Sequence, residues 1–374
     1  MKKIFLLVFV VTLVIICSSC QPKTYEIAMI TDVGSIDDKS FNQGTWEGVK
    51  KYGEEFNISH KYYKPREKST QAYLDTIDLA VKGGAKVIVT AGYLFENAIY
   101  QSQDKYKDVK FILIDGAPNN LVFNDAGDLV SGEERIEDNV YSIFYAEHES
   151  GFLAGYAAVK DGFRNLGFMG GMALPSVVKF GYGFVQGAEY AANELGLDDG
   201  AVKIRYHYLG GFEANPDYQT MAASWYADGI DVIFVAAGGA GSSIMKAAEV
   251  VNNKYVIGVD VDQSGESTVV ITSAIKKLST SVYQCLSVIY DENSQYKNLF
   301  KTKQKTVLDA TNDGVGLPED LSRFPNKAFT ASDYNRIYNS LKNDEVTIIS
   351  EQVPANQDLE TYLGLKKVDI TEIA

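Results

Sequence analysis

Cysteine and histidine are scarce in this chain, with three of each among 374 residues. Two of the cysteines lie within the first twenty residues, which leaves Cys285 alone in the rest of the chain. One thiol and three histidines cannot build a disulfide framework or a metal cluster. We therefore expect a protein that folds without disulfides, metal or cofactor, with an inert, buried thiol at Cys285.

Basic residues are also in the minority, since 35 Lys and Arg stand against 49 Asp and Glu and give a formal net charge of −14. Binding to nucleic-acid polymers needs clustered Lys and Arg that contact phosphates, so this balance argues against DNA or RNA as a partner. Catalytic signatures are missing as well: the sequence has no G-x-S-x-G elbow, no H-E-x-x-H and no Cys/His pair. These absences favour a binding protein over an enzyme.

The first twenty residues differ from the rest. Two lysines precede an unbroken apolar run from Ile4 to Ile16, which matches an export signal and is too short to span a bilayer permanently. Small residues directly before Cys20 resemble a lipoprotein signal whose cysteine is acylated after cleavage. The alternative is an ordinary secretory signal with incidental cysteines. We expect a signal peptide at residues 1–20, lipidation at Cys20, a tether at residues 21–24, and a folded part outside the cell membrane.

Short apolar runs alternate with amphipathic segments along the remaining chain. The runs are typical of parallel strands buried on both faces, and the segments between them predict crossover helices. Units of this kind form doubly wound α/β sheets with right-handed crossovers. The predicted strands are Tyr25 to Asp32, His60 to Lys64, Ala85 to Ala91, Val109 to Asp115, Tyr141 to Tyr145, Asn165 to Gly170, Val202 to Leu209, Asp231 to Ala237 and Tyr255 to Asp260.

The length of 374 residues indicates two lobes with a cleft between them. We expect lobe 1 at residues 25–139 and lobe 2 at residues 140–262. Residues 263–374 should cross back to both lobes and form several hinge segments, which would restrict the lobes to opening and closing. In this last part we expect a short strand at Val269 to Ile271, a helix at Ser273 to Tyr290 and a last strand at Val346 to Ser350.

Aspartates follow three of the predicted strands directly, at Asp32, Asp115 and Asp260. In open parallel sheets, ligands bind outside the carboxyl ends of the strands. Each aspartate alone can be explained by helix capping or an Asx turn. Together, with few basic residues nearby, they predict an acidic cleft. Because carboxylates accept hydrogen bonds from hydroxyl and amino groups, the predicted ligand is a neutral polyol or nitrogenous molecule, and a phosphorylated ligand would be repelled.

Three further side chains are candidates for the cleft. Phe41 offers a stacking face and Asn42 both a donor and an acceptor, although Phe41 could instead pack on its own helix. Lys276, expected near the start of a helix, is the cation that we place at the cleft, where it pairs with Asp260 or donates to a ligand. The alternative is a solvated lysine on a helix face.

A glycine turn at Gly238 and Gly239 separates a predicted strand from a helix. It lacks the Lys-Ser/Thr ending of a phosphate loop, so we expect it to bring backbone N–H groups close to a sugar or ring. For the two phenylalanines among the remaining candidates, packing in the core is an alternative. These remaining candidates are Tyr93, Met172, Phe180 and Phe234.

Four stretches match motifs of a known family: ITDVGSIDDKSFNQGTWEG (Ile30 to Gly48), FVAAGGAGSSIMKAA (Phe234 to Ala248), IGVDVDQS (Ile257 to Ser264) and VVITSAIKK (Val269 to Lys277). In these stretches the chain resembles the basic membrane protein (BMP) family of substrate-binding lipoproteins, which includes the purine nucleoside receptor of ABC transporters. The resemblance extends in order over essentially all of the mature chain. It implies a type I periplasmic-binding-protein fold, with two doubly wound parallel-sheet lobes around a hinged cleft.

The resemblance also implies a function. A chain of this kind is a monomeric, lipid-anchored binding protein that delivers a nucleoside, with a purine expected, to an ABC transporter permease. The alternatives are a receptor for a sugar or another small polar or signalling molecule, a membrane-held nucleoside hydrolase or deaminase, and a surface protein that binds host or matrix molecules. The roles implied are stacking of the base by Phe41 and Phe234, and hydrogen bonding by Asp32, Asp115 and Asp260, assisted by Asn42, Gly238, Gly239 and Lys276.

Overall fold

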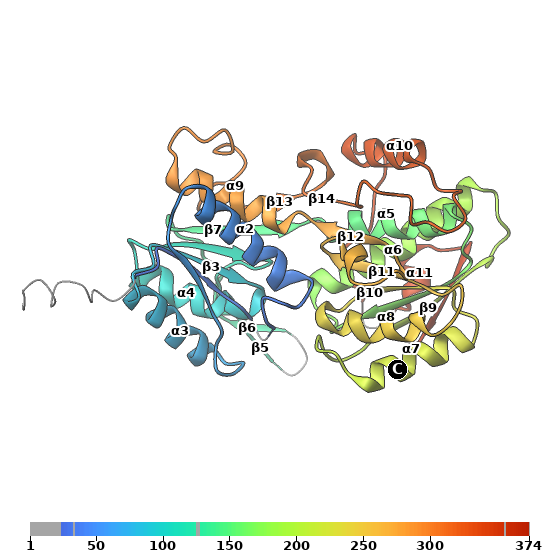
Figure 1. Cartoon of the computed structure of the whole chain (residues 1–374), viewed down its shortest axis with the longest axis horizontal. Coiled ribbons are helices and arrows are strands. Elements are labelled where there is room, and N and C mark those ends of the chain that lie inside the picture. Colours follow the sequence, from blue (N-terminus) through green and yellow to red (C-terminus); the bar gives the residue numbers. More distant parts are fainter. Residues whose placement is uncertain (1–23, 33, 125–127, 355–356, 374) are drawn as a thin grey trace, which may run out of the picture.

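The computed structural model describes residues 24–32, 34–124, 128–354 and 357–373. The predicted signal peptide, the acylation site Cys20 and residues 21–23 of the tether lie outside the described residues. Two α/β lobes lie side by side along the long axis of the molecule (Figure 1). No described helix combines the length and the apolar character needed to cross a membrane.

Lobe 1 is built on a six-stranded parallel sheet in the order β13-β7-β4-β3-β1-β2. Helices α2 and α9 cover one face of this sheet, and α3 and α4 cover the other (Figure 1). Its elements are β1 (Ile27–Ile30), α2 (Phe41–Glu55), β2 (His60–Tyr63), α3 (Thr70–Lys82), β3 (Val87–Ala91), α4 (Glu96–Lys105), β4 (Lys110–Ile114), the hairpin β5 (Val122–Phe123) and β6 (Leu129–Ser131), β7 (Val140–Tyr145), α9 (Leu278–Tyr290) and β13 (Lys305–Leu308).

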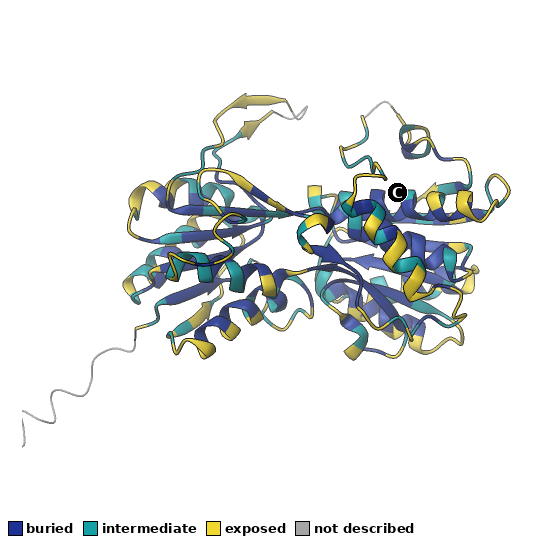
Figure 2. Cartoon of the chain, turned by 90° about the horizontal axis from the view of Figure 1, so that it is seen from above, coloured by how far each residue is buried: buried dark blue, intermediate teal, exposed yellow. Residues whose placement is uncertain are grey.

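Strand β1 shows why an apolar run becomes a central strand. Ile27 and Met29 enter the hydrophobic core beneath α2 and α9, whereas Ala28 and Ile30 enter the core beneath α3 and α4. Successive side chains of a strand point to opposite faces, so a run buried on both sides must be apolar throughout. Figure 2 shows the same burial along the strands of both sheets.

Lobe 2 is built on a seven-stranded sheet in the order β14-β12-β11-β10-β8-β9-β15, in which only the β12–β14 pair is antiparallel. Helices α5 and α6 cover one face and α7 and α8 the other (Figure 1). Its elements are α5 (Glu147–Lys160), β8 (Asn165–Gly170), α6 (Pro175–Glu194), β9 (Val202–Tyr208), α7 (Pro216–Ala227), β10 (Val232–Ala236), α8 (Gly241–Glu249), β11 (Tyr255–Asp260), β12 (Val270–Lys276), β14 (Val315–Gly316), α10 (Ala331–Lys342), α11 (Leu359–Leu363) and β15 (Val368–Glu372).

Helices α5 and α6 approach each other closely because glycines face the contact. A Cβ atom at Gly151 would lie 2.2 Å from the carbonyl oxygen of Phe180, and one at Gly155 would lie 1.9 Å from that of Phe184. Both distances are too short for any side chain, so glycine is required at these positions. The close packing places the first turn of α5 beside the first half of α6, at the side of lobe 2 that faces lobe 1.

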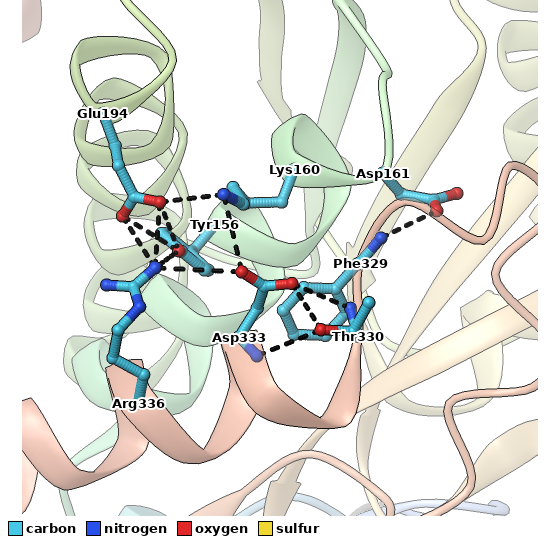
Figure 3. A network of polar contacts seen from close by, with 8 residues as sticks. All are labelled: Tyr156, Lys160, Asp161, Glu194, Phe329, Thr330, Asp333 and Arg336. Carbon is cyan, nitrogen blue, oxygen red and sulfur yellow. Dashed lines mark hydrogen bonds and ion pairs between the residues drawn. The ribbon is translucent and has the colours of Figure 1, made fainter.

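A polar network fastens the C-terminal helix α10 to α5 and α6 (Figure 3). Arg336 donates to both carboxylate oxygens of Glu194, at 2.8 Å and 2.9 Å, and Lys160 lies 2.8 Å from the same carboxylate. Asp161, just after α5, accepts a hydrogen bond of 3.3 Å from the N–H of Phe329. The last part of the chain is thereby bound to the body of lobe 2.

The described chain passes between the lobes three times: between β7 and α5, between β12 and α9, and between β13 and β14. The last part of the chain supplies α9 and β13 to lobe 1 and β14 and β15 to lobe 2. This agrees with the expected return of residues 263–374 to both lobes. Three parallel connections favour a hinge motion over independent movement of the lobes.

The structure differs from the sequence prediction at three places. Strand β7 pairs with β4 and β13 in lobe 1, so the lobes divide after Tyr145, not at residue 140. Residues 273–276 continue the fully buried strand β12 beside β11, and the helix begins only at Leu278. No strand forms at Val346 to Ser350; β15 occupies the sheet edge beside β9 instead. In each case the pairing partner, which is distant in sequence, decides the outcome.

Candidate ligand-binding site

A cleft of about 730 Å³ lies between the lobes, at the carboxyl ends of the strands of both sheets. The strand-end rule therefore identified the edge of each sheet that borders the cleft. Contact of these side chains with a ligand remains a prediction. The residues predicted from the sequence that line the cleft are Asp32, Phe41, Asn42, Tyr93, Asp115, Met172, Phe180, Gly238, Gly239, Asp260 and Lys276.

At the centre of the cleft, a buried lysine is surrounded by carboxylates. The Nζ atom of Lys276 lies 2.6 Å from Oδ2 of Asp115, 3.5 Å from Oε1 of Glu147 and 3.5 Å from Oδ1 of Asp260. Asp115 belongs to lobe 1 and the other three residues to lobe 2, so the shortest ion pair bridges the lobes. A second ammonium group, that of Lys179, lies 3.8 Å from Oε2 of Glu147, so three carboxylates face two ammonium groups in this cluster.

The pKa values of Glu147, Asp115 and Lys276 all lie above their ordinary values. Burial raises the pKa of Glu147 to about 7, against the opposing attraction of Lys276. Burial likewise raises the pKa of Asp115, although Lys276 again opposes the shift. For Lys276, burial favours the neutral amine, but the surrounding carboxylates outweigh it and raise the pKa above the ordinary lysine value. The lysine therefore stays charged at neutral pH, while Glu147 titrates there.

One carboxylate oxygen of the cluster has no hydrogen-bond partner among the described residues. This oxygen is Oδ1 of Asp115, which is buried, whereas Oδ2 accepts from Lys276. Leaving a buried acceptor unpaired costs about 1–3 kcal/mol, so this oxygen is suited to accept from an N–H or O–H of a ligand.

Asp115 and Asp260 also adopt left-handed backbone conformations, with φ of 53° and 66°. Such conformations are uncommon for non-glycine residues and cluster at functional sites.

The loop before α2 is shaped by Asp38. Its carboxylate accepts hydrogen bonds from the N–H groups of Ser40 at 2.9 Å and Gln43 at 3.0 Å, and from the side chain of Asn42 at 2.9 Å. Asn42 also donates to Oδ1 of Asp32 at 2.9 Å. Asp38 therefore caps α2 and holds Asn42 toward Asp32, so its role is to shape the loop.

Ser40 precedes α2, but its side chain bridges the two lobes. Its side chain makes no capping hydrogen bond, and its hydroxyl donates to Oδ2 of Asp260. The side chain of Gln263 in lobe 2 donates to the backbone oxygen of Lys39 at 2.8 Å. With the ion pair of Lys276 and Asp115, these contacts join the two walls of the cleft, so the lobes are held against each other in this conformation.

Phe234 does not line the cleft, in contrast to the prediction. It is fully buried in the middle of β10 and packs against Phe168, Phe180 and Phe184, with ring centroids 5.2–5.9 Å apart. A side chain in the interior of a central strand points into the core beneath the covering helices. The prediction of a stacking role at Phe234 is therefore wrong, and the alternative of core packing holds.

Besides Phe180, lobe 2 contributes the ring of Phe212, in the loop after β9, to the cleft. A Cβ atom at Gly171 would lie 2.3 Å from this ring, and the backbone oxygen of Phe212 accepts from the N–H of Ala240 at 2.9 Å. The glycine turn after β10 thus holds the loop of Phe212, and Gly238 has a φ of 53°. Phe41 lines the cleft from lobe 1, where the ammonium of Lys276 lies 4.9 Å from its ring centre.

Glu147 and Phe212 are among the residues of the site that the sequence analysis missed, for different reasons. Glu147 follows β7 by two residues, so the strand-end rule would have found it if it had been applied to that strand. Phe212 lies in an irregular loop, where periodicity gives no signal. Lys276 was assigned to the cleft, but it stands at the end of β12 and not at the start of a helix.

Metal chemistry has no site in the described part of the chain. Among those residues, no group of three His, Cys, Asp or Glu side chains is arranged to hold a metal ion. The carboxylates of the cleft surround an ammonium group instead. Cys285 is a free thiol whose pKa is raised by burial, which confirms the buried position expected for it.

Comparison with known proteins places these features in a family. The sequence model of the family described as ABC transporter substrate-binding protein PnrA-like matches residues 25–352. "Basic membrane protein A1" of Borrelia garinii subsp. bavariensis is 32% identical over 75% of this chain and 78% of its own length. "Basic membrane protein D" of Borreliella burgdorferi is 30% identical over 91% of this chain and 92% of its own.

A further relative carries a ligand in its name. The "ABC transporter nucleoside-binding protein BmpA" of Lactococcus lactis subsp. cremoris is 29% identical over 68% of this chain and 72% of its own length.

Solved structures share the fold. A solute-binding protein of an ABC transporter system from Aeropyrum pernix superimposes with a TM-score of 0.71 at 20% identity, over 88% of this chain and 94% of that one. A similar protein from Conexibacter woesei gives a TM-score of 0.65 at 18% identity, over 87% and 99% of the two chains. The two parallel-sheet lobes, the interlobe cleft and the family match lead to one conclusion: this chain belongs to the PnrA-like family of ABC transporter substrate-binding proteins.

Proposed function

We propose that this protein is a lipid-anchored receptor that captures a nucleoside, with a purine base preferred, and delivers it to the permease of an ABC importer. The observation that carries the proposal is the combination of aromatic and acidic groups in one cleft. Phe41 and Phe212 line it from different lobes, and the buried Oδ1 of Asp115 has no hydrogen-bond partner among the described residues. A nucleoside offers both a base that stacks and N–H and O–H groups that donate.

The charge of the cleft supports a nucleoside over a nucleotide. At its centre, three carboxylates face two ammonium groups. A phosphate group brought beside these carboxylates would be repelled, whereas ribose hydroxyls and base amino groups donate to them. The name of the Lactococcus lactis relative supports the same ligand class.

Calorimetry tests the ligand. The chain without residues 1–20 would be titrated with inosine, adenosine, guanosine, inosine monophosphate, a hexose and an amino acid. We expect the purine nucleosides to bind and the monophosphate to bind much more weakly. Binding of the hexose or the amino acid without any nucleoside would replace the proposal with a receptor for that ligand, since this fold hosts many.

Stacking is tested by Phe41→Ala. A stacked base should lose roughly 1–3 kcal/mol of binding free energy, whereas a non-aromatic ligand would scarcely respond.

Prolonged incubation of the protein with nucleosides, followed by chromatography, examines the enzymatic alternative. Release of free base or of a deaminated product at catalytic rates would contradict a transport role.

The anchor is tested at Cys20. Cells that express the full chain should carry it in the membrane fraction, with incorporation of labelled fatty acid, and Cys20→Ala should abolish both. Sedimentation of the chain without residues 1–20 would test whether it is the expected monomer. Transport assays with and without the protein would identify the permease. Fatty-acid labelling that survives in Cys20→Ala would refute the anchor and leave the ligand proposal untouched.

A further inference from the structure

We propose that the edge strand β2 and the loop that follows it form a contact surface for an anionic lipid membrane. This surface, called here the β2 strip, consists of residues 60–68, with the sequence HKYYKPREK. The inference rests on the proposed lipid anchor only for the nearness of the membrane. Two of the strip's cations, Lys61 and Arg66, do not line the cleft, so their contribution can be tested apart from the ligand.

The charge of the strip is opposite to that of the molecule. The whole chain has a net charge of −14, but the strip holds four cations and one acid. All four cations, Lys61, Lys64, Arg66 and Lys68, are exposed, and the described residues provide none of them with an ion pair. Elsewhere in lobe 1, lysines such as Lys86 and Lys105 are paired with carboxylates. Cations left without partners are complementary to an anionic surface.

Aromatic rings accompany the cations on both sides of the strand. Tyr62 is 42% exposed and its ring centre lies 5.5 Å from that of Trp46 on α2. On the other side, the ammonium of Lys61 lies 5.3 Å from the ring centre of Tyr25 and 5.0 Å from that of Tyr63. Tyrosine, tryptophan and lysine have apolar bodies with polar tips, which favours the interface between lipid and water.

The position of the strip matches the expected attachment point. Among the described residues, strand β2 pairs only with β1 and lies at one edge of the lobe 1 sheet. Tyr25, which Lys61 contacts, comes five residues after Cys20 in the sequence. A segment of that length reaches at most about 18 Å, so an acylated Cys20 would hold this edge close to the membrane.

The other end of the strip borders the ligand-binding cleft. Lys64 and Lys68 are among the residues that line it. A strip that rests on the membrane from the tether to the cleft would therefore turn one rim of the cleft toward the lipid surface. In this orientation the ligand is released beside the membrane, where the permease is located.

Vesicle binding tests the proposal. The chain without residues 1–20 retains all described strands, helices and core clusters, which lie within residues 24–373. It would be sedimented with vesicles of phosphatidylcholine alone, and of equal parts phosphatidylcholine and phosphatidylglycerol. We expect binding only to the mixed vesicles, weakened by salt. Lys61→Gln with Arg66→Gln should reduce the partition coefficient about tenfold or more, since each cation near an anionic surface contributes about 1 kcal/mol.

The matched control removes the same charge from lobe 2. Lys246 and Lys366 are exposed and have no ion pair among the described residues. Lys246→Gln with Lys366→Gln should leave vesicle binding unchanged. Tyr62→Ser tests the aromatic part and should weaken binding without altering its dependence on salt.

Several outcomes would overturn the proposal. The first is equal binding to both kinds of vesicle, and the second is an equal loss of vesicle binding in the strip and control variants. The third is displacement of the vesicles by a small amount of single-stranded RNA, which would assign the strip to a polyanion. If the strip variant only self-associates, the cations serve to protect a free sheet edge. Nucleoside calorimetry on the same variants keeps the two proposals apart, because neither Lys61 nor Arg66 lines the cleft.

Discussion

Lobe 1 and lobe 2 share a strand-and-helix plan, but they present different chemistry to the cleft. Lobe 1 contributes a polar loop ordered by Asp38, the ring of Phe41 and one buried acid, Asp115. Lobe 2 contributes Lys276 together with two further carboxylates and the ring of Phe212. Both lobes therefore supply aromatic rings, and lobe 2 also supplies the ammonium group that pairs with Asp115.

The lobes also differ in how their edges are finished. The sheet of lobe 1 ends at the exposed strand β2, whereas the sheet of lobe 2 gains β15 beside β9 near the end of the chain. Outside that sheet, α10 is fastened by the network around Glu194 (Figure 3). The comparison teaches that lobe 2 is extended by segments from the last part of the chain, and that lobe 1 depends on lobe 2 for the ammonium group beside its buried acid.

The largest effect is expected when the shared cation is removed. Lys276→Met removes the ammonium group that pairs with Asp115 and Asp260, which should lower the free energy of unfolding by about 3–5 kcal/mol. Urea unfolding followed by circular dichroism measures this loss. Lys277→Met changes the exposed neighbour and serves as the control. If both variants lose the same stability, the cluster does not depend on its lysine.

The next effect concerns pH. The pKa of Glu147 is raised from its ordinary 4.5 to about 7 in the folded protein, where Lys276, Asp115 and Lys179 surround it. Between these values the folded state binds more protons than the unfolded state, so stability falls as pH rises from about 4.5 to about 7 and is level above. A shift of this size corresponds to about 3 kcal/mol.

Glu147→Gln should remove that share of the pH dependence and make the free energy of unfolding flatter over this range. Urea unfolding at a series of pH values measures it. Burial also raises the pKa of Glu149 to about 7. The free energy of unfolding of the variant should therefore keep a part of its pH dependence that comes from Glu149. The exposed Glu292→Gln is the control. An unchanged slope in Glu147→Gln would mean that Glu147 does not titrate as the structure indicates.

A smaller effect is expected to distinguish Phe212 from Phe234 as the lobe 2 ring that contacts the ligand. Phe212→Ala should weaken nucleoside binding by about 1–3 kcal/mol, because a ring that lines the cleft is lost, and should change stability little. Phe234→Leu should do the reverse, with a stability loss of about 1–3 kcal/mol from an imperfectly filled core and little change in affinity. Calorimetry and urea unfolding on both variants decide between the rings, and a loss of affinity in Phe234→Leu alone would restore the original assignment.

The smallest effect is expected at the outer network of lobe 2. The side chain of Arg336 is 48% exposed, so Arg336→Met should cost no more than about 1 kcal/mol. Its consequence should be local, with faster hydrogen exchange in α10 and unchanged exchange in lobe 1. Arg66→Met, at an exposed arginine of lobe 1, is the control. Faster exchange throughout both lobes would show that the network stabilises more than α10.

Much of the fold and of the cleft could be predicted from local patterns. Strands β8 and β11 begin and end at the predicted residues, because an apolar run bounded by polar residues and turns carries its own limits. Asp32, Asp115 and Asp260 were found for a related reason. Parallel strands end at a common edge of their sheet, so a residue that follows a strand is located by the strand alone.

The surroundings of each side chain were decided by the tertiary structure. The apolar sequence of β7 would be the same whichever sheet the strand joined. Likewise, the sequence around Phe234 would be the same whether the ring lined a cleft or filled a core. The pKa of Glu147 and the charge of Lys276 depend on partners from three other strand ends, distant in sequence. The sequence by itself determined which segments form strands, helices and ligand loops, because that information is local. Only the tertiary structure decided which groups meet, because burial and ion pairing arise between residues that the chain brings together in space.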